Sequence, residues 1–321
     1  MADQKATALS ELSVPTLDDI AYMVDNPGGT PVSAKLSLGR LLGLLNHIVQ
    51  GRLTLESGVP VSSTDQTAKS TLYFTPYNGN LVSVYDGSRW LIKQFTELSL
   101  ALTGLTADKN YDVFLTNTPA LELSAAWTND TTRATAIAQQ DSVDIKSGDA
   151  TRRWLGTIRA VTSTTTEDSL LKRFVWNKYN RVRRKMLRQT PDVSWTYSTV
   201  GTWRSANADN ANRLQFVVGV KEDPIECRVT TVAQSTVNMW SGVGLALDAT
   251  NTNHADLWGT WSNSTNTPVR AFAEYAVVPS IGFHYIQWVE NIINGAGTVT
   301  FSGIASAGPF AQFGLIGFLQ N

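Results

Sequence analysis

Apolar and polar residues alternate along most of this chain, at the spacing that is typical of β-strands. The alternation begins within residues 18–36, on both sides of the turn sequence Asn-Pro-Gly-Gly-Thr-Pro at residues 26–31. Its apolar positions are Ile20, Tyr22 and Val24 before the turn and Val32, Ala34 and Leu36 after it. The two glycines supply the backbone angles that a hairpin loop needs. The pattern therefore predicts a β-hairpin.

The apolar spacing then changes to that of a helix. Ser37 is placed to cap a short amphipathic helix from Leu38 to about Gln50, and Gly51 would end it. The apolar residues of this segment share one stripe: Leu38, Leu41, Leu42, Leu45, Ile48 and Val49. Such a stripe either packs on the chain's own hairpin or forms a seam between identical chains in a trimer.

Residues 52–176 are predicted to form a β-rich meander and a small β-sandwich. The pairs Asn78-Gly79 and Asp86-Gly87 separate three apolar runs, which predicts a three-stranded meander over residues 71–93. Short apolar runs at regular spacing then predict the strands of a sandwich. These runs are residues 98–102, 112–116, 120–125, 143–146, 154–162 and 174–176.

Residues 177–192 are the only dense basic run of the chain. Aromatic and β-branched residues at 174–182 favour a strand that continues into a linker over the alternative, a helix. One basic run without a wider basic and aromatic face is not a nucleic-acid footprint, so we expect no nucleic acid as a partner. We expect this linker to anchor the preceding domain or to pair with acidic groups on a neighbouring subunit.

Residues 193–321 are predicted to form a second β domain. Eight apolar runs in this length match the size of a jelly roll: 194–198, 214–220, 227–233, 241–247, 269–278, 282–291, 298–304 and 312–319. Residues 310–319 are apolar on both faces, so this strand must lie centrally in a sheet or in a subunit contact. The predicted fold is mainly β: a hairpin and short helix (1–51), then two β-sandwich or jelly-roll-like domains (52–176 and 193–321).

Composition narrows the classes of function. The formal net charge is −1 and only 17% of the residues are charged, so no global charge favours nucleic acid or an anionic membrane. Cys227 is the single cysteine, which excludes an intrachain disulfide and a cysteine-based metal site. The start lacks the apolar stretch of a secretory signal, and no run is long enough for a membrane helix. We expect assembly in a cytoplasm and no membrane insertion.

No pattern in the sequence predicts catalysis. The histidines His47, His254 and His284 lie outside metal-binding motifs, and there is no GxSxG elbow or P-loop. Cys227 lies inside a predicted strand, where a structural thiol is expected. We therefore expect a protein that is not an enzyme, with no catalytic residue, no metal and no cofactor.

The polar, turn-rich stretch 248–268 is the candidate ligand site. Sugar sites combine an aromatic face with planar amides or carboxylates, and this loop offers both. The predicted glycan or receptor contacts are Asn253, His254, Asp256, Trp258, Trp261 and Asn263. Alternatively, the two tryptophans cover the end of the sandwich or fill a subunit contact, where tryptophan is also enriched.

Several segments resemble virion proteins of tailed bacteriophages, including tail fibres and head fibres. They are residues 6–51, 85–90, 174–182, 194–198 and 282–285. The resemblance implies a non-enzymatic virion appendage, a homotrimer that docks on other tail or capsid proteins through residues 1–51. Its C-terminal domain would then attach to a host cell-surface glycan. The alternatives are a capsid decoration protein or tail adaptor with a purely structural role, and a glycan-degrading tail enzyme.

Overall fold

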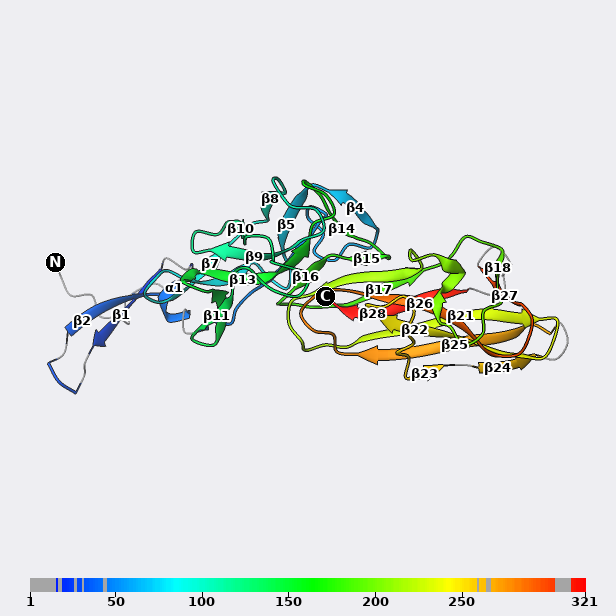
Figure 1. Ribbon diagram of the computed structural model, residues 1–321. Coiled ribbons are helices and arrows are strands. Elements are labelled where there is room, and N and C mark those ends of the chain that lie inside the picture. Colours follow the sequence, from blue (N-terminus) through cyan, green and yellow to red (C-terminus); the bar gives the residue numbers. More distant parts are fainter. Residues whose placement is uncertain are drawn as a thin grey trace.

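The computed structural model describes residues 16, 19–25, 28–30, 32–42, 45–258, 260–263, 267–303 and 313–321. The chain is mainly β, as predicted, and is drawn out along one direction (Figure 1). A hairpin lies at one end, a middle body follows, and a two-sheet sandwich forms the other end. No helix in these residues is long and apolar enough to cross a membrane.

The predicted hairpin is present. Strand β1 (Ile20–Asp25) pairs antiparallel with β2 (Val32–Ser37), with Ile20 opposite Ser37 and Asp25 opposite Val32. The hairpin extends away from the other sheets (Figure 1). Ile20, Met23 and Val32 are exposed, so this hairpin leaves apolar surface in water.

The predicted helix is present at its start and wrong from residue 45 on, while residues 43–44 lie outside the described residues. Helix α1 covers only Leu38–Leu42, and residues 46–47 form a turn. Ser83 N donates to Ile48 O at 2.9 Å, and Val49 bridges to Val82 in the core of the middle body. This β pairing is stronger than the weak tendency of a short isolated helix to persist. The predicted stripe is therefore divided: Leu41 and Leu45 are exposed, Leu38, Leu42 and Ile48 are half-buried, and Val49 is buried.

The predicted meander is correct only in its second half. Strands β6 (Leu81–Tyr85) and β7 (Trp90–Gln94) form a hairpin across the Asp-Gly turn. Strand β5 (Thr71–Pro76) instead pairs with β3 (Gly51–Thr54) and β8 (Leu98–Ala101). Gln50 binds the segment that connects β5 to β6 at both of its ends. Its main-chain oxygen accepts from Tyr77 N, and its side-chain Oε1 accepts from Leu81 N, both at 2.9 Å.

A larger sheet completes the middle body, and all the strands expected in the small sandwich occur. Its path is β10 (Leu121–Leu123), β9 (Asn110–Thr116), β13 (Asp149–Arg159), β12 (Val143–Lys146) and β11 (Ile137–Gln140), with β16 (Val175–Asn177) on β13. Leu72 and Phe74 from the smaller sheet and Val113, Leu155 and Val175 from this one share one buried core.

Two sheets form the C-terminal sandwich, and each of its eight predicted strands is present. The first sheet, here the outer sheet, runs β17 (Arg183–Arg188), β28 (Gly314–Gln320), β21 (Ile225–Ser235), β25 (Val269–Val277) and β23 (Leu257–Trp258), with β27 (Val299–Ser302) on β21 and β18 (Ser194–Tyr197) on β27. The second runs β24 (Thr260–Asn263), β22 (Met239–Leu247), β26 (Gly282–Asn294), β20 (Arg213–Val218), β15 (Lys172–Arg173), β14 (Thr166–Asp168) and β4 (Gln66–Lys69), with β19 (Arg204–Ser205) on β26.

The core of the sandwich lies between these two sheets. Phe216 and Trp288 from the second sheet meet Val229, Phe301 and Leu315 from the outer sheet in one buried cluster. Alternation along each strand places these side chains on the inner faces.

The second sheet extends across the boundary predicted near residues 177–192. Strands β4, β14 and β15 come from the segment assigned to the preceding domain, and β15 pairs parallel with β20, Lys172 opposite Gln215. Part of the predicted basic linker is itself strand β17. Arg184 in it is buried, and Arg181 forms ion pairs with Glu222 and Asp223 of the same chain.

The apolar strand near the end of the chain lies where its composition predicts. Strand β28 pairs with β17 on one side and β21 on the other, so it is central in the outer sheet. Leu315 and Leu319 are buried in the core, whereas Ile316 and Phe318 are half-buried on the opposite face. Residues 310–312 of the predicted strand lie outside the described residues.

Candidate functional site

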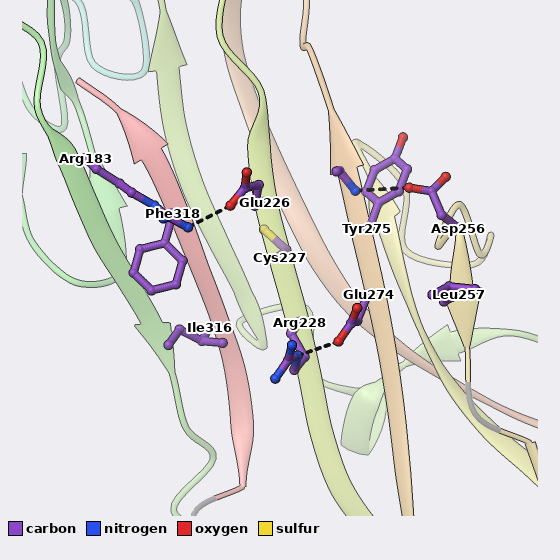
Figure 2. A pocket seen from close by; sticks show the side chains of 11 residues that line it. Arg183, Glu226, Cys227, Arg228, Asp256, Leu257, Glu274, Tyr275, Ile316 and Phe318 are labelled. Carbon is purple, nitrogen blue, oxygen red and sulfur yellow. Dashed lines mark hydrogen bonds and ion pairs between the residues drawn. The ribbon is translucent and has the colours of Figure 1, made fainter.

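A cavity of about 490 Å³ lies on the solvent side of the outer sheet (Figure 2). We call it the outer groove. Its lining comes from β17, β28, β21, β25 and β23, and its main side chains are Arg183, Glu226, Arg228, Glu274, Ile316 and Phe318. Five separate segments of the sequence therefore build one surface.

Strand register explains which residues meet in the groove. Ile316 lies opposite Arg228, Arg228 opposite Glu274, and Glu274 opposite Leu257, so these side chains form one row across the sheet. Side chains at alternate positions point to the same face of a sheet. Phe318 and Glu226 form the next row along the same face.

The floor of the groove is apolar and aromatic. Ile316 and Phe318 supply it from β28, and the exposed side chain of Leu257 borders it at the sheet edge. The Arg183 guanidinium lies 4.3 Å from the centroid of the Phe318 ring (Figure 2). An apolar floor under polar groups can hold the hydrophobic face of a ligand.

Two ion pairs cross the groove, and both are exposed to water. Arg228 Nε lies 2.7 Å from Glu274 Oε1, with the two side chains 55% and 40% exposed. Arg183 Nη2 lies 2.7 Å from Glu226 Oε2. Exposed pairs of this kind contribute only about 0–1 kcal/mol to stability. These planar groups can therefore turn to a ligand at little cost to the fold.

The remaining polar groups of the groove are neutral donors or are held by the backbone. Burial and the nearby carboxylates of Asp256 and Asp248 raise the pKa of Tyr275, so its phenol keeps its proton. Asp256 Oδ2 accepts from Ala276 N at 3.2 Å. Burial, with a smaller effect of Glu226, raises the pKa of Cys227, so its thiol is not an activated nucleophile.

A second hollow of about 610 Å³ adjoins the groove and shares Arg228 and Ile316 with it. It is lined further along the same sheet by Lys185, Leu187 and Phe313, among others. The two hollows therefore share the part of their lining that Arg228 of β21 and Ile316 of β28 provide.

Among the six predicted glycan contacts, Asp256 lines the outer groove. Asn253 and His254 instead bind the backbone of β22. Asn253 Oδ1 accepts from Leu245 N at 3.2 Å and Ala255 N at 3.0 Å, and His254 Nδ1 accepts from Leu247 N at 3.1 Å. These bonds fix the chain that leads to β23.

The other three predicted contacts lie in strands rather than in a loop. Trp258 in β23 is opposite Ala273 of the outer sheet. Trp261 and Asn263 in β24 are opposite Ser241 and Met239 of the second sheet. The predicted single site is thus divided between the edges of two sheets, and the side chains of these three residues lie outside the described part.

The groove residues that sequence reasoning missed carried one signal. Ile316 and Phe318 belong to the strand noted as apolar on both faces, which predicts burial or contact but not a ligand. Arg183, Arg228 and Glu274 give no local signal, because they meet only through strand pairing. In the described part of the chain, no group of three or more His, Cys, Asp or Glu side chains could hold a metal ion.

Comparison with known proteins assigns no family. No protein-family model and no curated protein matches the sequence. Similar solved structures include the insecticidal delta-endotoxin Cry8Ea1 from Bacillus thuringiensis (9% identity, TM-score 0.23, 95% of this chain and 60% of that one). Another is a glycoside hydrolase family 43 arabinoxylan arabinofuranohydrolase from Bacillus subtilis (12% identity, TM-score 0.21, 96% of this chain and 69% of that one). A third is a Cry1Da tryptic core variant from Bacillus thuringiensis (6% identity, TM-score 0.19, 95% of this chain and 58% of that one). Similarities at this level carry no statement about this chain's fold or function.

Proposed function

We propose that this chain is a non-enzymatic bacteriophage virion appendage, a tail fibre or head fibre. It docks on other virion proteins through residues 1–51, and its C-terminal sandwich attaches to a glycan on the host surface. The sandwich is jelly-roll-like in this proposal, and the assembled form is a homotrimer. The proposal rests on the sequence resemblance and on one structural observation, the outer groove. The sandwich that carries this groove forms the end of the molecule opposite the hairpin (Figure 1).

The chemistry of the outer groove supports a glycan as its ligand. Sugars present C–H faces that pack on aromatic rings, and hydroxyl pairs that bind planar carboxylates and guanidinium groups. Phe318 and Ile316 offer the apolar surface, and Arg228 and Glu274 offer exposed planar groups.

The exposed apolar hairpin supports docking at the other end. Ile20, Met23 and Val32 leave apolar side chains in water on a hairpin that pairs with no other strand among the described residues. The register places Met23 and Val32 on the same face of the hairpin, and exposed apolar residues that lie together mark interaction surfaces. The same surface suits the alternative of a structural decoration protein or tail adaptor, in which the outer groove would contact a neighbouring subunit.

The test is binding of the labelled full chain to an array of bacterial surface glycans. The full chain is needed because strands from residues 66–173 belong to the second sheet of the sandwich. We expect saturable binding that Arg228→Ala weakens about tenfold, whereas Arg89→Ala, which breaks an exposed ion pair on the middle body, leaves binding unchanged. Absence of glycan binding, or equal loss in both variants, would overturn the attachment role.

Immunogold labelling of intact particles separates the remaining alternatives. Label at the tail supports a tail fibre. Label at projections from the head supports a head fibre, whereas an even layer over the capsid supports a decoration protein. Absence of label from purified particles contradicts the virion proposal itself.

A further inference from the structure

Another cavity, separate from the outer groove and from the hollow beside it, lies at the junction of the middle body and the sandwich. It has a volume of about 330 Å³. We call it the junction cavity. Its polar lining consists of three hydroxyl residues, one carboxylate and two guanidinium groups: Ser62, Ser63, Thr64, Asp65, Arg173 and Arg184. None of these side chains lines the outer groove.

Positive charge exceeds negative charge in the buried wall of this cavity. Arg173 Nη1 lies 2.9 Å from Asp168 Oδ1, and Arg184 Nη2 lies 3.4 Å from Asp168 Oδ2. One carboxylate thus serves two arginines, and all three residues are buried. Buried charges in proteins are normally matched by opposite charge, so one more negative group would stabilise this arrangement.

A third arginine adds to the excess. Arg52 is 2% exposed, and its acceptors among the described residues are the main-chain oxygens of Pro60, Asn180 and Asn321. Burial, followed by the charge of Arg184, lowers the pKa of Arg52 to about 10. Burial also lowers the pKa of Arg184, and the charge of Arg173 adds to this effect.

The arginines also retain capacity to donate. Arg173 Nε is buried and has no hydrogen-bond acceptor among the described residues. Arg184 directs the same nitrogen, Nη2, to Asp168 and to the Ser62 main-chain oxygen at 2.9 Å. The planar guanidinium has five N–H donors in a fork that matches the oxygens of an oxyanion.

We propose that the junction cavity binds a phosphate or sulfate group. Arg173 and Arg184 supply the charge and forked donors, and the hydroxyls of Ser63 and Thr64 complete the contacts from the exposed rim. The negative charge of Asp65, on the same rim, repels the anion. Its Oδ1 accepts from Leu170 N at 2.8 Å, so the carboxylate has a structural role that an asparagine would keep.

Isothermal titration calorimetry of the full chain with sodium phosphate, at constant ionic strength maintained with chloride, tests this site. We expect one ion per chain. Asp65→Asn should bind phosphate at least about threefold more tightly, because one unit of repelling charge is removed. The double variant Ser63→Ala, Thr64→Ala should bind more weakly. Both changes are at exposed residues, so the test does not depend on variants of buried arginines that fail to fold.

Asp86→Asn is the matched control, because Asp86 Oδ1 also accepts main-chain N–H groups in an exposed turn away from the cavity. It should leave phosphate binding unchanged.

A second titration, with a sugar phosphate, distinguishes a free phosphate ion from a phosphate group on a larger ligand. The sugar phosphate binds more tightly than the free ion only if the natural ligand is the larger molecule. Absence of saturable heat in every protein, or Asp65→Asn binding no tighter than the natural chain, contradicts the proposal. Arg228→Ala should not alter it, which separates this site from the outer groove.

Discussion

Trp195 in β18 donates its indole N–H to the carboxylate of Glu290 in β26, at 2.6 Å, inside the C-terminal sandwich. Arg204 lies 2.7 Å from the same carboxylate, which is fully buried. The contacts join the short strands β18 and β19 to the longest strand of the second sheet. A buried acid at this position makes the stability of the sandwich sensitive to pH.

Stability should fall as the pH rises from about 5 to 8. Burial raises the pKa of Glu290 from 4.5 to about 7, although Trp195 and Arg204 act in the opposite direction. The folded chain therefore holds this proton more tightly than the unfolded chain. The resulting stabilisation is complete below the unfolded pKa and is lost as the pH rises through the folded pKa, with a slope of up to about 1.4 kcal/mol per pH unit.

Urea unfolding at pH 5, 6, 7 and 8 measures this slope, and the variant Glu290→Gln isolates it. Glutamine cannot titrate, so the difference in slope between the two proteins is the contribution of Glu290. Burial also raises the pKa of Asp112, which titrates in both proteins and cancels in the comparison. Identical slopes in the two proteins would contradict the assignment.

Replacement of Arg133 by alanine should cost about 3–5 kcal/mol of unfolding free energy, because it leaves a buried carboxylate without its cation. Arg133 Nε lies 2.9 Å from Asp112 Oδ2, and its guanidinium carbon lies 4.6 Å from the ring centroid of Trp127 and 4.9 Å from that of Trp154. Its Nη2 also donates to Gly219 O at 2.8 Å, which joins the middle body to the sandwich.

Chemical unfolding of Arg133→Ala measures this cost, and Arg89→Ala is its control. Arg89 pairs with Asp86 at 3.5 Å in an exposed turn, where loss of the pair should change stability by less than about 1 kcal/mol. A loss for Arg133→Ala as small as that for Arg89→Ala would contradict the prediction that the buried carboxylate of Asp112 depends on Arg133 as its cation.

Most strands could be predicted from the sequence, but their partners could not. The alternation that places Phe216 and Val229 in the core is a local signal, and the strands that carry it lie where it indicates. Strand β17 was missed because Arg184, a charged residue, occupies a buried position and breaks the pattern. The pairing of β5 with β8 rather than β6 depends on contacts that no local signal records.

The same limit applies to the candidate site. Asp256 was predicted because it belongs to a stretch whose composition suits sugars. The outer groove, however, depends on Ile316 lying opposite Arg228, residues 88 positions apart by their numbers. Composition identifies a local stretch, whereas register between distant strands decides which side chains share a surface.

Phe318→Ser should weaken glycan binding by about tenfold or more while the fold persists. Phe318 is half-buried on the outer face of β28, and its inward neighbours Leu315 and Leu319 stay in the core. Aromatic anchors contribute strongly to binding through desolvation of one face. Glycan-array binding and a thermal unfolding scan, measured together, separate lost contact from lost structure. Unchanged binding by a folded variant would remove Phe318 from the site.

Removal of residues 1–42 should abolish incorporation into particles without unfolding the remainder. Among the described residues the hairpin pairs with no other sheet, and Ile20 and Val32 are exposed on it, so little of the remaining fold depends on it. Complementation of a phage that lacks the natural chain, followed by blotting of purified particles, measures incorporation. A shortened chain that incorporates at the natural level contradicts the docking role of this segment.

The full chain should sediment as a trimer of 35.0 kDa subunits. The exposed side chains of Leu41 and Leu45 are the remnant of the predicted stripe that is free to form a seam between chains, because Val49 is committed to the core of its own subunit. Substitution of both leucines by serine should therefore give monomers that stay folded, since neither side chain belongs to a buried cluster of the described residues. Leu36→Ser, which changes a half-buried residue in the neighbouring strand β2, is the matched control and should leave the trimer intact.

Sedimentation equilibrium at micromolar concentration decides between the outcomes. A natural chain that sediments as a monomer contradicts trimerisation, and a trimer that survives the double substitution places the seam elsewhere, with the outer face of β28 as the next surface to substitute.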